Sequence, residues 1–169
     1  IYTEPGITNI NDGYLFEHHP LSRTELSELI GVPSYDEDAI RKVLETGNGQ
    51  SWINEDVELA KDEQERKFHA FDRPTEVYDA LEFWGKVSGK MLLEWGMEEE
   101  DIPDEAKEYD ACVWMVGNYV IKAVLNYDPL GEKPYAKTSF IKHPGAFWGK
   151  GIPELIEDLQ GVCNAAARA

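Results

Sequence analysis

The side chains best suited to chemistry lie in the segment Glu17-His18-His19, because carboxylate and imidazole groups bind metal ions and transfer protons. Adjacent residues of a strand point to opposite faces, so the two neighbouring histidines are not expected to share one metal ion. His69 and His143 stand alone, and no HExxH or CxxC motif supplies a second pair of ligands. We therefore predict no metal site and interpret the two histidines as surface or half-buried residues.

Motifs of nucleotide-binding and acyl-transfer enzymes are missing from the sequence, which contains no GxSxG, GxGxxG or Walker A pattern. Residues 145–151 are rich in glycine, but Lys150 is followed by Gly151 and not by Ser or Thr, so no phosphate cradle is expected there. With 33 Asp and Glu residues, chance explains any close pair of carboxylates. We expect no enzymatic activity and no cofactor.

Composition narrows the class of protein. The 169 residues fit a single domain, and 42% apolar residues suffice for a buried core. The net charge of -17 opposes tight binding to nucleic acid or to an anionic membrane, and no apolar run is long enough to span a bilayer. The two cysteines form neither a disulfide framework nor a zinc motif, so we expect the chain to originate in a reducing cytoplasm.

The acidic residues are unevenly distributed. Residues 1–116 hold 28 acidic against 10 basic residues, whereas residues 117–169 hold 5 against 6. The acidic run over residues 98–110 lacks the glycine and asparagine alternation of an EF-hand loop, so we interpret it as a solvated surface. The chain starts at Ile1 and stops inside an Ala-rich run, from which we expect a piece of a longer polypeptide.

Short helices are predicted in the first half of the chain. Ser22 and Glu25 form a capping box ahead of a helix that ends near Gly31. Asp36 caps a second helix over residues 37–46, and Asn54 caps a third over residues 55–67.

Strands are predicted in the middle of the chain. Alternating apolar residues from position 75 indicate a strand, and a short helix or turn follows it around residues 91–95. Residues 109–116 and 119–126 flank Gly117-Asn118, a dipeptide typical of tight hairpin turns. Another strand is predicted over 135–142 and a long helix over 152–169. The class is therefore α+β, with antiparallel strands over about 75–142 flanked by short N-terminal helices and a long C-terminal helix.

A strand-to-helix corner precedes the last helix. Glycines that flank an aromatic pair permit a sharp turn, and we expect Phe147 and Trp148 to anchor it by burial, with Trp148 as a structural anchor and not a ligand-binding residue. On the helix, Gln160 and Asn164 are four residues apart and could contact another subunit. The residues assigned to the corner are Pro144, Gly145, Phe147, Trp148, Gly149, Gly151 and Pro153.

This corner resembles the portal (head-to-tail connector) proteins of tailed bacteriophages. The resemblance extends over most of residues 13–169 and is most specific in the C-terminal stretch. The matching residues of this stretch are Lys137-Thr138-Ser139-Phe140, the run from Pro144 to Leu155, Asp158-Leu159-Gln160 and Asn164 to Arg168. Weaker similarity lies in Leu26 to Pro33, Glu82 to Gly89, Trp95-Gly96-Met97, Val113-Trp114 and Val120 to Ala123.

The resemblance implies the wing region of a structural virion protein. Such subunits form a twelve-membered ring at one capsid vertex, and phage DNA is packaged and ejected through that ring. The implied partners are identical subunits, the terminase, head and tail proteins, and DNA that passes without tight binding. The implied location is the virion portal vertex, after assembly in the bacterial host cytoplasm, and no membrane is involved.

Two other classes stay open at this point. An acidic hydrolase or carbohydrate-binding domain would use carboxylates together with Trp52, Trp84 and Trp148. An acidic partner-binding module would mimic nucleic acid and bind a basic protein.

Overall fold

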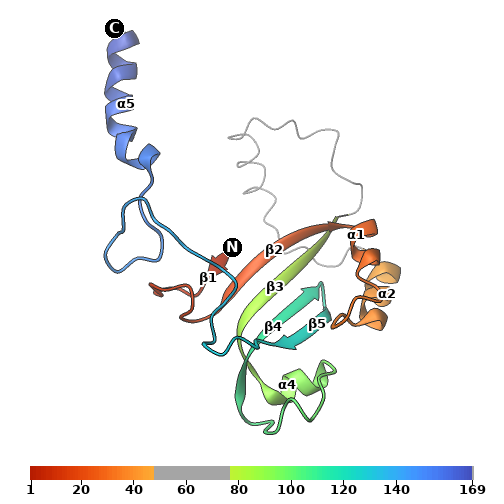
Figure 1. The fold of residues 1–169 in the computed structure, drawn as a ribbon. Coiled ribbons are helices and arrows are strands. Elements are labelled where there is room, and N and C mark those ends of the chain that lie inside the picture. Colours follow the sequence, from red (N-terminus) through yellow and green to blue (C-terminus); the bar gives the residue numbers. More distant parts are fainter. Residues whose placement is uncertain (48–76, 169) are drawn as a thin grey trace.

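The computed structural model describes residues 1–47 and 77–168, and the helix predicted over 55–67 lies outside them. Within the described residues the sheet is a five-stranded antiparallel meander in the order β1 to β5 (Figure 1). Its strands are β1 (Tyr2–Thr3), β2 (Leu15–Ser22), β3 (Val77–Ser88), β4 (Glu108–Val116) and β5 (Tyr119–Leu125).

The described helices are α1 (Arg23–Glu28), α2 (Glu37–Thr46), α4 (Gly89–Glu94) and α5 (Ile152–Arg168). The predicted α+β class is confirmed, including the long C-terminal helix.

Side-chain caps begin the first two helices as predicted. Both hydrogen bonds of the Ser22 and Glu25 capping box are present at α1. The Asp36 carboxylate accepts a hydrogen bond of 3.0 Å from the backbone N–H of Ala39 at α2. Gly47 ends α2 with a φ of 81°, a backbone conformation that favours glycine.

The hairpin of β4 and β5 turns at Gly117, whose φ is 57°, as the dipeptide predicted. By contrast, the strand predicted over residues 135–142 is wrong, because this segment is irregular and, within the described part of the chain, pairs only through an isolated bridge between Ile141 and Lys150. The predicted strand range also omitted β1 and β2, which precede the helices in sequence.

Apolar side chains form two clusters on opposite faces of β3, since Tyr78 and Ala80 belong to one cluster and Val87 to the other. Helices α1 and α2 cover the first cluster at one end of the strand, and α4 covers the second at the other end (Figure 1). Buried members of the first cluster include Leu26, Ile40 and Ile121. The part of the first face that α1 and α2 leave uncovered carries polar side chains.

Helix α5 stands apart from the sheet at the end of a long irregular segment (Figure 1). None of its side chains is buried. Its apolar residues Leu159 and Val162 are 67% and 68% exposed, so the packing that a helical apolar stripe normally requires is not supplied by the described residues.

Candidate functional site

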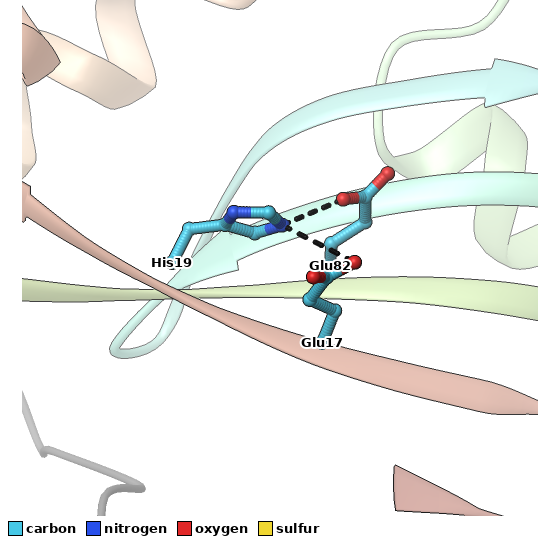
Figure 2. Close-up of side chains that lie close together, drawn as sticks. All are labelled: Glu17, His19 and Glu82. Atoms are coloured by element: carbon cyan, nitrogen blue, oxygen red, sulfur yellow. Dashed lines mark hydrogen bonds and ion pairs between the residues drawn. The ribbon is translucent and has the colours of Figure 1, made fainter. Parts of the chain in front are cut away.

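Three polar side chains converge on the part of this sheet face that lies beyond α1 and α2 (Figure 2). Glu17 and His19 are two residues apart on β2 and therefore share a face, and Glu82 of β3 lies directly opposite Glu17. His19 Nε2 lies 2.7 Å from Oε2 of Glu82 and 4.0 Å from Oε2 of Glu17. One donor atom from each of the three residues lies within 4.8 Å of the other two.

Neighbouring aromatic residues hold these three side chains in place. The indole N–H of Trp84 donates a hydrogen bond of 2.7 Å to Oε1 of Glu82, and the Tyr135 hydroxyl donates to Oε2 of Glu17. The His19 ring stacks on Trp114, with ring centres 4.5 Å apart and planes 12° from parallel. The side chains of Glu17 and His19 are 28% and 29% exposed and that of Glu82 is 12% exposed, so the cluster is half-buried.

Burial at this cluster raises the pKa of neighbouring groups, and the Glu82 carboxylate adds to the effect. Burial, with the nearby charge of Glu82, raises the pKa of the Cys112 thiol to about 12 and also raises the pKa of Tyr35. Burial and the hydrogen bond to Glu17 raise the pKa of Tyr135. Because its pKa is this high, Cys112 stays a protonated thiol at neutral pH and is a poor nucleophile or metal ligand.

His18 lies on the opposite face, where its Nδ1 is 3.0 Å from the buried carboxylate of Asp79. The two adjacent histidines therefore diverge, as the strand geometry predicted. The sequence interpretation nevertheless missed the pairing of Glu17 with His19, two residues apart, and the third group, Glu82, contributed by β3. The i and i+2 spacing was visible in the sequence, whereas the strand register that adds Glu82 was not.

The corner before α5 differs from its prediction in one respect. Phe147 is 8% exposed and packs beneath Lys137, whose ammonium lies 4.1 Å from the ring centre. The expected burial of Trp148 is wrong, because its side chain is 62% exposed and meets Phe147 edge to face. Phe147 is therefore the buried aromatic of this corner.

The other corner residues shape the backbone. Pro144 and Gly145 form an exposed turn in which Gly145 has a φ of 75°. A Cβ atom on Gly149 would lie 2.5 Å from the Ile141 carbonyl oxygen, so this close approach requires glycine. Gly151 precedes α5, and Pro153 lies in its first turn as predicted.

The candidate contact residues of α5 face the same side of the helix. The Gln160 side-chain amide donates a hydrogen bond of 3.2 Å to the Asn164 side-chain oxygen, and both residues are exposed.

Among the described residues, no helix is both long and apolar enough to cross a membrane. The comparisons with protein-family models and with curated proteins found no match to this chain.

Proposed function

We propose that this chain is the wing region of a portal subunit, a structural protein that forms a ring at one vertex of a tailed-bacteriophage capsid. The proposal rests on the sequence resemblance around the corner and α5, and on one structural observation, the unpacked apolar stripe of α5. The protein would act by assembly and not by catalysis. DNA would pass through the ring without tight binding.

The apolar stripe of α5 carries the proposal. A stable water-exposed helix normally buries such a stripe against its own domain or a partner. The exposed fractions of Ile152, Leu155, Ile156, Leu159 and Val162 lie between 43% and 68%.

The composition of α5 suits close packing against other helices. Gly161 and three consecutive alanines from Ala165 leave room for a second backbone to approach. Gln160 and Asn164, already hydrogen-bonded to each other, could contribute polar contacts to a neighbouring subunit. A ring of identical subunits would supply such neighbours around its whole circumference.

The net charge of -17 agrees with a conduit for DNA. A protein that bound the phosphates with many lysines and arginines would hold the polyanion instead of letting it slide. The acidic surface would repel the DNA backbone and keep passage free of tight contacts.

The variant Leu159→Asp, made in the full-length protein that contains this chain, should weaken ring assembly. An apolar side chain of this size contributes about 1.5–3 kcal/mol when it is buried, so its loss should raise the concentration needed for assembly by at least about tenfold per contact. Size-exclusion chromatography with light scattering measures the assembled fraction. Because Leu159 is 67% exposed here, the unfolding of the sheet domain should not change.

Leu130→Asp is the matched control. Leu130 is 82% exposed but lies in the loop after β5, outside α5. The proposal expects this variant to assemble like the wild type. If Leu159→Asp also assembles like the wild type, α5 is not the assembly surface.

A further inference from the structure

Glu17, His19 and Glu82 present three metal-ligating side chains toward one point between β2 and β3 (Figure 2). Two carboxylate oxygens and one imidazole nitrogen make up the set, and the helices play no part in it. Neither the resemblance nor the assembly proposal requires such an arrangement.

The cluster contains a cross-strand pair of two carboxylates, Glu17 and Glu82. Glu17 and Glu82 are directly opposite each other on neighbouring strands, where like charges destabilise a sheet. Both carboxylates are at least partly shielded from water, which strengthens their repulsion. A cation bound between the two carboxylates would offset this repulsion.

Neighbouring side chains orient the oxygen and nitrogen atoms of this cluster, just as hydrogen-bonding partners orient the ligands of known metal sites. Trp84 holds Oε1 of Glu82, which leaves Oε2 of the same carboxylate directed at His19. The stacking on Trp114 fixes the plane of the His19 ring with Nε2 toward both carboxylates. The three donors are thus supported by the fold on more than one side.

We propose that Glu17, His19 and Glu82 bind one divalent transition-metal ion, for which Zn²⁺ is the natural probe. Imidazole with carboxylates suits Zn²⁺, Mn²⁺, Co²⁺ and similar ions, whereas Ca²⁺ and Mg²⁺ favour oxygen ligands alone. Bonds of about 2.0–2.2 Å place neighbouring ligand atoms roughly 3–3.5 Å apart. The Nε2 to Glu82 distance of 2.7 Å and the Nε2 to Glu17 distance of 4.0 Å bracket that spacing, so small side-chain rotations complete the site.

The bound ion would join two strands that are distant in sequence. His19 and Glu82 are 63 residues apart, and the chain between them includes α1 and α2. A ligand that binds only the folded state stabilises it by mass action. Zn²⁺ should therefore raise the thermal unfolding midpoint in proportion to the logarithm of its free concentration.

Calorimetric titration of the metal-stripped full-length protein, purified without a histidine tag, tests the site. We expect one Zn²⁺ per subunit, and an affinity at least about tenfold weaker in Glu17→Gln and Glu82→Gln than in the wild type. Glu28→Gln removes an exposed carboxylate from α1 and should leave the affinity unchanged. Mg²⁺ should not compete at equal concentration, whereas a merely acidic surface would bind both ions alike.

Cobalt spectroscopy gives a second readout that does not depend on the stability of the variants. Co²⁺ added to the wild-type protein should give visible absorption bands different from those of the hydrated ion. His19→Gln should abolish these bands, and His143→Gln, at an exposed histidine outside the cluster, should retain them. A wild-type spectrum identical to that of hydrated Co²⁺, or equal Zn²⁺ affinity in the wild type and Glu17→Gln, would overturn the proposal and leave a hydrogen-bonded histidine and carboxylate cluster.

Discussion

Replacing Tyr78 with alanine should lower the free energy of unfolding by about 3–5 kcal/mol, the usual cost of truncating a buried aromatic side chain. Tyr78 is 1% exposed and belongs to the apolar cluster beneath α1 and α2, with Leu26 and Ile40 around it. Its hydroxyl also accepts a hydrogen bond of 3.2 Å from the Arg23 guanidinium. The truncation therefore removes both a core side chain and a contact to α1. Chemical denaturation followed by circular dichroism measures the change.

Two further variants separate the contribution of the buried ring from that of the hydroxyl hydrogen bond and from the general effect of losing a tyrosine side chain. Tyr78→Phe keeps the ring and removes only the hydroxyl, so it should cost about 1 kcal/mol. Tyr127→Ala truncates the same residue type at a position that is 73% exposed, and its effect should stay within about 0.5 kcal/mol. Equal effects of Tyr78→Ala and Tyr127→Ala would contradict the assignment of this core.

The variant Gly89→Ala should destabilise the protein by about 1–3 kcal/mol, although alanine is normally the better helix former. Gly89 begins α4 and is buried against the segment before β4. A Cβ atom there would lie 2.7 Å from the Asp104 carbonyl oxygen and 2.8 Å from a methyl group of Ile102. Since the nearest atom belongs to the backbone, a side-chain rotation cannot relieve the clash.

Gly161→Ala is the matched control, a glycine-to-alanine change in a helix that is expected to stabilise and not to destabilise. Gly161 lies inside α5, and a Cβ atom there meets no atom within 4 Å. Its replacement should leave the sheet domain unchanged and favour the helix by up to about 1 kcal/mol. Thermal unfolding of both variants tests the pair, and a Gly89→Ala midpoint equal to or above that of the wild type would show that α4 does not pack as described.

Elements with a local signal could be predicted from the sequence. The caps at Ser22 and Asp36 and the Gly117-Asn118 turn act on their near neighbours alone, and the structure has all three. The long helix that begins at Ile152 followed from its apolar period and from Pro153 in its first turn. Predicting these features requires no knowledge of the tertiary fold.

Elements that depend on distant partners could not be predicted in this way. Strand β2 lacks a continuous apolar alternation, because Glu17 and His19 occupy the face that meets Glu82, and its pairing partner β3 follows more than fifty residues later. Residues 135–142 show the opposite error, because residues with strand propensity were predicted to form a strand but have no strand beside them among residues 1–47 and 77–168.

The same reason explains the errors around the candidate sites. The sequence pattern predicted burial of both Phe147 and Trp148, but only Phe147 is buried, because the side that faces inward depends on how the turn approaches residue 137. The polar cluster required the register between β2 and β3, which places Glu82 opposite Glu17. Neither fact is encoded in local spacing.

Electron microscopy of the purified full-length protein tests the assembly proposal most directly. Negative-stain class averages should show closed rings with twelvefold symmetry, and light scattering of the same sample should give a mass that is a matching multiple of the subunit mass. A single monomeric species at every concentration, with no rings in the images, would contradict the proposal that this chain belongs to a portal subunit.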